Sequence, residues 1–376
     1  MESEIKKLKK KLLTKSKQEK LPFKKGLSTG STLLNLACSG RPSVGLLPGR
    51  YYLLVGDTNS GQSWFSNSIL AEASINPNYD NYRLIYDDVE GGSLMDLRKY
   101  FGNKLADRME PPDTEKDGSP IHSTVIEEFY YHVDNALREE KPFIYILDSV
   151  DSLSSTDEIK KFDQNKKAHY KTQNTEDGEE GPKIKGSYGD GKAKKNASNL
   201  RRLMGSLQST GSILLIINQT HDNIGFDAMF NPKSRSGGHA LEYYATVQMW
   251  SSILKKVKKN IRGKDRQIGL ISKIHVKRTR ITGKDRIVYV PIYHSVGIDD
   301  TGSCIDYLIE EKHWVQRKGQ IETTEFCFSA TREKLIAYIE ENNKERELRL
   351  IVAEVWNDIE EACKVNRKNK YQEIPQ

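Results

Sequence analysis

Four short runs of apolar residues constrain the fold of this chain more than any other feature. Continuous runs of this kind are typical of strands that are buried on both faces of a parallel sheet. They are "YYLLVG" (51–56), "RLIYDD" (83–88), "FIYILDS" (143–149) and "SILLIINQ" (212–219). Helical patterns lie between them, at about 62–75, 122–140 and 194–209. This order predicts an α/β fold with a mostly parallel central sheet.

Further elements are expected on either side of these runs. Strands are predicted at 245–252, 272–280 and 286–294, and "ITGKD" forms a hairpin turn between the last two. The stretch 331–370 has a helical pattern, and the lysine-rich residues 1–20 carry apolar residues at roughly helical spacing. Two stretches, 154–192 and 220–238, break the pattern, and such lengths are usually functional loops or disordered.

Composition narrows the class of protein. The net charge of +7 favours an acidic partner, nucleic acid first, although a protein with spare lysines remains an equal alternative. The four cysteines are far apart, so neither a zinc site nor disulfides are expected. The chain has no apolar run long enough for a membrane helix and no signal peptide, which favours a cytoplasmic protein without a membrane partner.

The stretch "VGDTNSGQSW" follows the first apolar run and opens a predicted helix. A glycine loop in this position presents backbone N–H groups and the positive end of a helix to phosphate. Gly56, Gly61 and Ser63 fit the pattern G-x-x-x-x-G-K-[ST], but Gln62 stands where the pattern has lysine. Ser63 is placed to bind Mg²⁺. A plain joint between a strand and a helix is the alternative.

Polar residues end the other three runs. Asp148 is placed to hold Mg²⁺, Glu90 can accept a proton from a hydrolytic water, and Gln219 can sense a terminal phosphate. Ligands of open α/β sheets bind at the carboxyl ends of the strands. The sequence therefore predicts a nucleotide and Mg²⁺ site that contains Gly56, Asp57, Thr58, Asn59, Ser60, Gly61, Gln62, Ser63, Trp64 and Asp148.

From about Gly26 to Gly319 the chain resembles RecA and its phage relatives of the UvsX kind. The resemblance is carried by "LSTGSTLLNLACSGRPSVGLLPGRYYLLVGDTNSGQS", "DDVEGG", "ILDSVDSL", "NLRRLMGSLQSTGSILLIINQT" and, most specifically, "NIGFDAMFNPKSRSGGHALEYYATV". It extends to "IHVKRTRI" and "YHSVGIDDTGSCIDYLIEEKHW". It implies an ATP-dependent recombinase of bacteriophage type that forms helical filaments on single-stranded DNA and exchanges strands with double-stranded DNA.

The resemblance also implies roles for residues and segments. Glu90 and Gln219 take catalytic roles, and Lys277 and Arg280 reach a neighbour's ATP. The loops at 154–192 and 220–238 take the place of two DNA loops. Expected DNA contacts are Lys192, Lys194, Arg201, Ile224, Gly225, Phe230, Lys233, Arg235, Ser236, Gly237 and Gly238. Independently of the resemblance, basic residues beside strand ends suit salt-sensitive phosphate contacts.

The expected organisation has three parts. Residues 1–25 form a polymerisation arm, 26–320 a RecA-like ATPase core and 321–376 a small C-terminal helical region. Single-strand-binding and mediator proteins are expected partners, in the cytoplasm of the host if the chain is phage-encoded.

Two alternatives stay open from the residues. The first is a DNA-binding scaffold that binds ATP but hydrolyses it poorly. Gln62, natural or engineered, indicates it, because glutamine keeps a hydrogen-bond donor but lacks the charge of lysine. The second is a hexameric helicase with the same core, although helicases of this fold do not need "MFNPKSRSGGHALEYYA".

Overall fold

A computed structural model describes residues 23–92, 95–173, 190–222 and 233–367. The polymerisation arm predicted at 1–25 lies almost entirely outside these residues, as do Ile224, Gly225 and Phe230.

The fold is mixed α/β and is organised around a ten-stranded sheet with the order β12-β11-β10-β9-β1-β7-β6-β2-β3, with β8 paired to β7. Six neighbouring strands, β9, β1, β7, β6, β2 and β3, run parallel. β10 is antiparallel to β9, with which it forms a hairpin, and also to β11. The strands are β1 (Arg50–Gly56), β2 (Arg83–Asp88), β3 (Met109–Glu110), β6 (Phe143–Asp148), β7 (Ile213–Asp222), β8 (Lys233–Arg235), β9 (Val247–Ile261), β10 (Lys264–Thr279), β11 (Arg286–Tyr293) and β12 (Gly297–Ile298).

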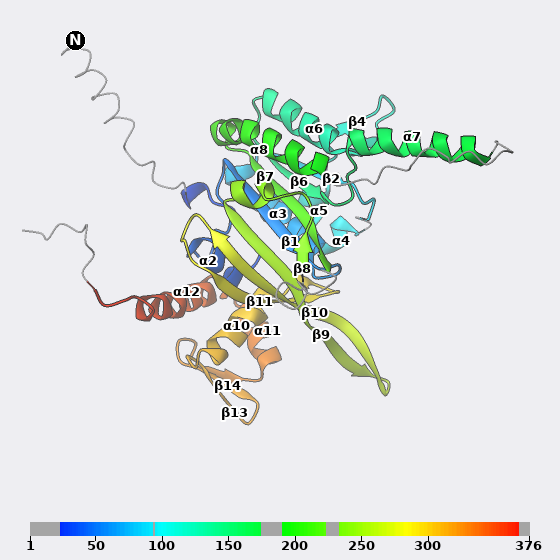
Figure 1. Cartoon of the computed structure of the whole chain (residues 1–376). Helices are drawn as coiled ribbons and strands as arrows, with labels where there is room; N and C mark the ends of the chain where they lie inside the picture. The colour runs from blue at the N-terminus through cyan, green and yellow to red at the C-terminus, as the bar shows by residue number, and fades with distance from the viewer. Residues whose placement is uncertain (1–22, 93–94, 174–189, 223–232, 368–376) are drawn as a thin grey trace, which may run out of the picture.

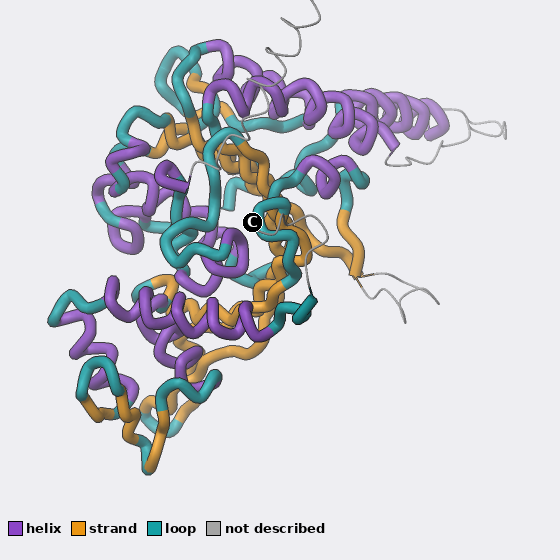
Figure 2. The backbone as a smooth tube through the Cα atoms, turned by 90° about the vertical axis from the view of Figure 1, so that its left-hand side faces the viewer, coloured by secondary structure: helices purple, strands orange, loops and turns teal. Residues whose placement is uncertain are grey.

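Helices cover both faces of this sheet (Figures 1 and 2). They are α2 (Thr32–Ser39), α3 (Gln62–Ile75), α4 (Leu97–Phe101), α5 (Asn103–Ala106), α6 (Ile126–Arg138), α7 (Thr156–Gln173), α8 (Asp190–Thr210), α9 (Ala240–Tyr244), α10 (Asp300–Glu310), α11 (Arg332–Glu341) and α12 (Glu345–Ala362). Short 3-10 turns are η1 (Phe23–Lys25) and η2 (Pro77–Tyr79). Small sheets are formed by β4 (Asp113–Thr114) with β5 (Pro120–Ile121), and by β13 (Val315–Arg317), β14 (Gln320–Thr323) and β15 (Phe328–Ala330).

The alternation of side chains along β1 divides the core into two clusters. Tyr51, Leu53 and Val55 pack with α6 and α8 on one face. Tyr52 and Leu54 pack with α2, α3 and the C-terminal helices on the other. Successive side chains of a strand point to opposite faces, so an unbroken apolar run needs cover on both sides. The predicted parallel α/β sheet is therefore confirmed, with element boundaries shifted by a few residues.

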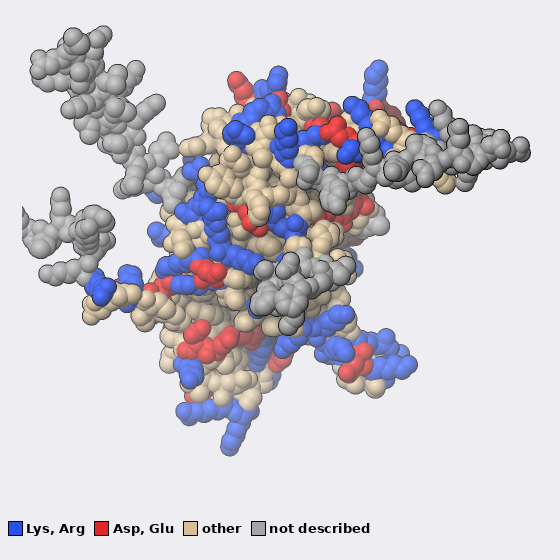
Figure 3. Space-filling view, viewed as in Figure 1, with Lys and Arg blue, Asp and Glu red and all other residues tan. Residues whose placement is uncertain are grey.

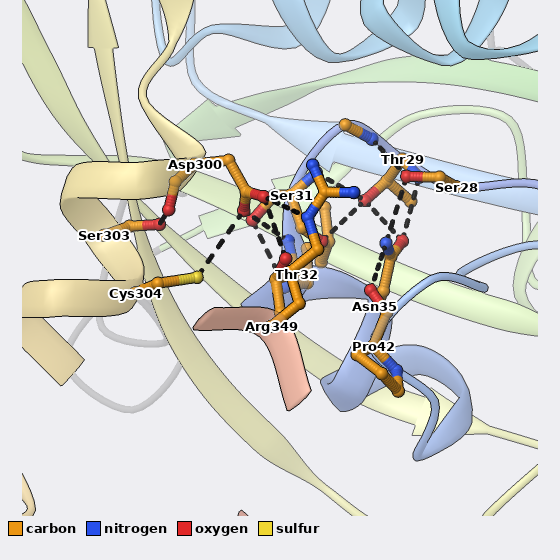
Figure 4. Close-up of polar contacts among 12 residues, drawn as sticks. Ser28, Thr29, Ser31, Thr32, Asn35, Pro42, Asp300, Ser303, Cys304 and Arg349 are labelled. Atoms are coloured by element: carbon orange, nitrogen blue, oxygen red, sulfur yellow. Dashed lines mark hydrogen bonds and ion pairs between the residues drawn. The ribbon is translucent and has the colours of Figure 1, made fainter. Parts of the chain in front are cut away.

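Asp300 connects the C-terminal helices to α2 (Figure 4). Its carboxylate accepts hydrogen bonds from the Thr32 backbone N–H at 2.6 Å and from the Thr32 hydroxyl at 2.8 Å. Arg349 on α12 donates to the same carboxylate at 3.2 Å. Burial raises the pKa of Asp300, while Arg349 and Thr32 act in the opposite direction. The start of α10 is thus held against α2 and α12 by one shared carboxylate.

Two predictions about irregular segments are wrong. The stretch 154–192 contains α7 and the start of α8, and 220–238 contains the end of β7 and the strand β8 paired with it. The helical pattern at 331–370 is confirmed by α11 and α12, but residues 321–330 of the region predicted to be helical contain β14 and β15, which form part of a small sheet. The hairpin of β9 and β10, which projects from the body, was predicted only at its base (Figure 1).

The α7 helix escaped prediction because it has no apolar stripe. It projects away from the body, and Phe162 is 66% exposed (Figures 1 and 2). A capping box begins it: the Ser155 N–H donates to Glu158 Oε2 at 2.8 Å and the Glu158 N–H donates to Ser155 Oγ at 3.2 Å. A helix that lies largely in solvent needs good helix-forming residues and a cap rather than a hydrophobic face.

Glu360 on α12 forms a bidentate ion pair with Arg286 on β11, at 2.6 and 2.7 Å, and also pairs with Lys284. Hydrogen bonding to Arg286 lowers the pKa of Glu360 to about 2. A lowered pKa stabilises the fold above the unfolded pKa, and that stability disappears as pH falls through the folded pKa. We expect Glu360→Gln to lower the free energy of unfolding at pH 7 by about 1–2 kcal/mol.

Denaturant unfolding at a series of pH values measures this effect. The difference from wild type should stay constant above pH 5 and shrink as pH falls from about 4.5 toward 2. Glu361→Gln is the matched control, because Glu361 is 69% exposed in its pair with Lys364 and should change stability by no more than about 0.5 kcal/mol. Equal effects of the two substitutions would contradict the assignment.

Candidate functional site

The glycine loop lies between three parallel strands at the carboxyl edge of the sheet. Gly56, the last residue of β1, is in register with Gln219 of β7 and Ser251 of β9. A Cβ atom at Gly56 would lie 1.9 Å from Ser251 Oγ, so this close approach requires glycine. The loop residue Ser60 is fixed by a 2.7 Å hydrogen bond to the Ser251 hydroxyl.

Gly61 precedes α3 with φ of 101°, in the left-handed region. The positive φ requires glycine, and a Cβ atom there would also lie 2.5 Å from Ile292 Cδ1, so that side chain would have to move. The N–H groups of the first turn of a helix have no partner within the helix. The first turn of α3, at Gln62 and Ser63, lines the cavity, as an anion site at a helix N-terminus requires, whereas the N–H groups of Asp57 and Ser60 are bonded within the chain.

The loop borders a cavity of about 530 Å³. Nine predicted residues line it, and six that were not predicted complete the wall. The predicted residues are Thr58, Asn59, Gly61, Gln62, Ser63, Trp64, Glu90, Asp148 and Gln219. The others are Met95, Ile253, Lys256, Gln267, Leu270 and His294. Four of these six lie on β9 and β10, about two hundred positions after the loop, and their alternating polar and apolar pattern gave no indication of a ligand site.

Gln62 does not point freely into the cavity. Its amide nitrogen donates to the backbone oxygens of Asn218 at 3.1 Å and Leu54 at 3.5 Å. In this position it joins the ends of β1 and β7, where a lysine would have placed a full positive charge. Asp57 is also used within the chain, since its carboxylate pairs with Lys233 at 2.5 Å and accepts a hydrogen bond from Thr220.

Asp148 and Ser63 lie together at the floor of the cavity. The Ser63 hydroxyl donates to Asp148 Oδ2 at 3.4 Å, and the Tyr86 hydroxyl donates to the same oxygen at 2.6 Å. Burial raises the pKa of Asp148 to about 6, with like charge from Glu90 and Asp88 adding to the effect, while Tyr86 and Ser63 act against it. A carboxylate that is costly to ionise is one that a cation would stabilise.

Glu90 lies where three elements meet. Its Oε1 accepts hydrogen bonds from Ser149 at 2.6 Å, from Gln219 Nε2 at 2.7 Å and from Ser152 at 3.1 Å. Asp87, on β2 three residues earlier, is buried and accepts hydrogen bonds from Ser123 and Tyr145. Asp87 is thus held within the fold, whereas Glu90, in the turn that follows β2, lines the cavity.

Asp151 was not predicted, yet it links the cavity to the segment that follows β7. It accepts hydrogen bonds from the Gln219 N–H at 2.5 Å, from Asn218 Nδ2 at 2.8 Å and from the hydroxyl of Ser236. The sequence signal was present, since Asp151 follows the third apolar run closely, but nothing in it indicated that Ser236 folds back to the same point.

The basic residues predicted to contact DNA differ in their environment. Lys194 and Arg201 are exposed on α8. Lys192 lies 4.0 Å from Glu158, and Lys233 pairs with Asp57. Arg235 is only 6% exposed and pairs with Glu242 at 2.8 Å, so contact with DNA would require this pair to open. Gly237 and Gly238 form a turn against α8, where Asn196 donates to the Gly237 oxygen at 2.9 Å.

Lys277 and Arg280 do not line the cavity of their own chain. The Lys277 ammonium lies 3.4 Å from the centre of the Trp250 ring, and burial lowers its pKa. Arg280 lies over the ring of Tyr243 and donates to its backbone oxygen. Their predicted role toward a neighbouring subunit stays a prediction.

The part of the chain that the structure describes offers no group of three or more His, Cys, Asp or Glu residues that could hold a metal ion. An Mg²⁺ ion at Ser63 and Asp148 would therefore need oxygens from phosphate and water, which is how this ion is usually bound. None of the described helices is long and apolar enough to cross a membrane.

Comparison with known proteins shows similarity to one group. Residues 177–299 match the family model described as the RecA N-terminal domain. RecA of Trichodesmium erythraeum is 30% identical over 164 residues, which are 42% of this chain and 44% of that protein. RecA of Prochlorococcus marinus (strain MIT 9211) is 25% identical over 326 residues, 85% of this chain and 76% of the relative. RecA of Rippkaea orientalis is 25% identical over 331 residues.

The fold and the comparisons together define a class. The chain has an α/β fold whose mostly parallel central sheet is consistent with a RecA-like core, and it is similar to RecA proteins along most of its length. The matched family segment contains the strands β7 to β11, and the glycine loop lies before it.

We expect Asp148→Asn to stabilise the protein in the absence of nucleotide. The raised pKa means that the ionised carboxylate disfavours the folded state, so wild type loses stability as pH rises from about 4 through about 6. Denaturant unfolding at pH 7.5 should give the variant a free energy of unfolding about 1–3 kcal/mol above wild type. The difference should vanish near pH 4. Asp265→Asn, at an exposed carboxylate of the hairpin tip, is the control. A variant no more stable than this control would contradict the prediction.

Proposed function

We propose that this chain is an ATP-dependent DNA recombinase that forms helical filaments on single-stranded DNA for homologous pairing and strand exchange with double-stranded DNA. Similarity to RecA proteins supports the class. The single observation that carries the proposal is the 2.7 Å hydrogen bond from Gln219 to Glu90. It joins the cavity to the strand that leads directly into 220–238, where the resemblance predicts a DNA loop.

The residues present fit ATP with Mg²⁺. The loop 56–63 supplies backbone donors for phosphate oxygens, and Ser63 with Asp148 supplies ligands for the metal. Trp64, which lies 5.2 Å from the Tyr100 ring, gives the cavity an aromatic wall. When bound, Mg²⁺ neutralises charge on the β- and γ-phosphates.

Glu90 is the proposed general base. It lies on the cavity wall and is held by the hydroxyls of Ser149 and Ser152, so that its carboxylate can accept a proton from water beside the terminal phosphate. Gln219 orients this carboxylate through its amide. A change in the position of Glu90 would therefore shift Gln219 on β7.

From Gln219 the contacts continue toward the proposed DNA-binding face. Asp151 accepts hydrogen bonds from the Gln219 N–H and from the Ser236 hydroxyl. One carboxylate therefore contacts the residue before the segment 220–238 and a residue near its end. Lys194 and Arg201 are exposed on the neighbouring helix α8 and would contact phosphates without reading sequence. ATP in the cavity would thus favour one arrangement of the DNA-binding segments.

The finer assignments rest on the resemblance alone. They are the phage-type branch, the polymerisation arm at 1–25, contacts of single-strand-binding and mediator proteins, and a place in the host cytoplasm. A second function, a scaffold that binds ATP and DNA but hydrolyses poorly, is favoured by the uncharged Gln62. Electron microscopy with ATP and single-stranded DNA tests assembly: helical filaments are expected, and closed rings would favour a helicase.

Hydrolysis of ATP with and without single-stranded DNA tests the main proposal. We expect DNA to stimulate ATP hydrolysis by wild type. We expect Gln62→Lys to hydrolyse ATP faster than wild type by up to about 10²–10³, because the positive charge of a lysine stabilises the negative charge of the transition state. Glu90→Gln should lower the rate by at least about 10². Glu115→Gln, at an exposed carboxylate outside the cavity, should leave the rate unchanged.

The outcomes separate the alternatives. If DNA stimulates neither wild type nor Gln62→Lys, the recombinase proposal is wrong. If only Gln62→Lys hydrolyses ATP, the scaffold is the better description.

We expect Gln219→Ala to uncouple DNA binding from ATP. It removes the contact with Glu90 while leaving the basic residues of α8 in place. Fluorescence anisotropy should show that ATP no longer tightens binding to labelled single-stranded DNA, whereas binding without nucleotide stays within about threefold of wild type. Asn78→Ala, which removes an exposed amide elsewhere, should keep the ATP effect. If ATP still tightens DNA binding by Gln219→Ala as much as in wild type, the contact between Gln219 and Glu90 does not couple the two sites.

A further inference from the structure

The cavity has an unusual balance of charge. Glu90 and Asp148 line it, and the loop position that would carry a lysine has the neutral Gln62. Among the residues that the structure describes, Lys256 is the one lysine or arginine in the cavity wall. A polyphosphate in this cavity therefore has one permanently charged candidate partner among the described residues of the same chain, Lys256, beside the imidazole of His294.

The sheet brings Lys256 to this position. β9 pairs in parallel with β1, and Gly56 is opposite Ser251. β1 ends at Gly56, but β9 continues to Ile261, so the hairpin rises beyond the carboxyl edge of the sheet and past the glycine loop (Figure 1). Lys256 is five positions beyond Ser251 on this extension, opposite Leu270, which also lines the cavity.

A β-bulge decides which lysine faces the cavity. Ser272 pairs with Ile253, whereas its neighbour Ile271 pairs with Lys255, so Leu254 is an extra residue in β9. After this shift Lys256 lies on the same face as Ile253 and lines the cavity. Lys255 lies on the other face and lines a separate groove together with Leu254 and Ile271. Two adjacent lysines of equal charge thus face different sites.

Lys256 is exposed, and in the described part of the chain it has neither an ion pair nor a hydrogen bond from its ammonium group. The two basic residues expected at a nucleotide are engaged elsewhere, Lys277 with Trp250 and Arg280 with Tyr243. Figure 3 shows lysine and arginine side chains gathered along the hairpin. Most of these are beyond the cavity, at Lys258, Lys259, Arg262, Lys264 and Arg266.

We propose that Lys256 binds the phosphates of the nucleotide in the cavity of its own chain and supplies the positive charge that Gln62 lacks. This inference rests on the proposed ATP site. The glycine-loop pattern places this positive charge at the start of α3, whereas in this chain it lies on a β-hairpin. The charge at the phosphates therefore depends on the position of the hairpin. Gln62 is then free to join the ends of β1 and β7.

Titration of the full-length protein with Mg·ATP and with AMP tests the proposal. Lys256→Ala should weaken ATP binding about 10- to 100-fold, as loss of one charge-assisted contact does. It should change AMP binding by less than about threefold, because AMP lacks the β- and γ-phosphates. Lys256→Arg should restore ATP binding to within about threefold of wild type. Circular dichroism verifies that each variant is folded.

Lys255→Ala is the matched control, since it removes the same charge one residue away on the opposite face. It should leave ATP affinity within about twofold of wild type. In the Gln62→Lys background, Lys256→Ala should cost less than about threefold, because the new lysine contacts the same phosphates.

Three results would overturn the inference: equal ATP affinity of Lys256→Ala and wild type, equal losses in Lys255→Ala and Lys256→Ala, or the same loss with and without the Gln62→Lys change. If wild type binds Mg·ATP and the Lys256 variants bind it equally well, the inference fails and the proposed function stands. If wild type does not bind Mg·ATP, both fail.

Discussion

The parallel pairing of β1 with β7 and β9 is the constraint on which the rest of the structure depends. Because Gly56 is in register with both Gln219 and Ser251, the glycine loop, the polar end of β7 and the base of the hairpin meet at one edge. The approach is so close that a single Cβ at Gly56 would overlap Ser251. A shift of this register by one residue would move every side chain at the edge to the opposite face.

The edge contains two kinds of polar group with different functions. Asp151 joins β7 to Ser236 through several hydrogen bonds, and Gln62 joins β1 to β7 through two. Glu90, Ser63 and Asp148 line the cavity, and the raised pKa of Asp148 shows that its ionised form is poorly stabilised by the protein. Groups that hold strands together therefore lie beside groups that a ligand would contact, and Gln62 and Glu90 belong to both sets because they also line the cavity.

The sequence predicted the central part of this arrangement well. The apolar runs at β1, β2, β6 and β7 fixed the parallel sheet, and nine of the predicted residues line the cavity. The predictions failed where the usual signal is absent. The α7 helix lacks an apolar stripe, and the outer half of the β9–β10 hairpin is too rich in lysine to look like a strand. Hydrophobic periodicity detects elements that are buried, and these two lie mostly in solvent.

The sequence by itself determined the α/β class, the glycine loop, and the acids and amides at the strand ends, because these depend on local patterns and on the rule that parallel strands place their carboxyl ends together. Only the tertiary structure decided which groups meet there. It placed Ser236 on Asp151 and, through a bulge at Leu254, Lys256 rather than Lys255 on the cavity wall. These contacts join residues many positions apart, and their geometry depends on sheet register, which no local stretch of sequence encodes.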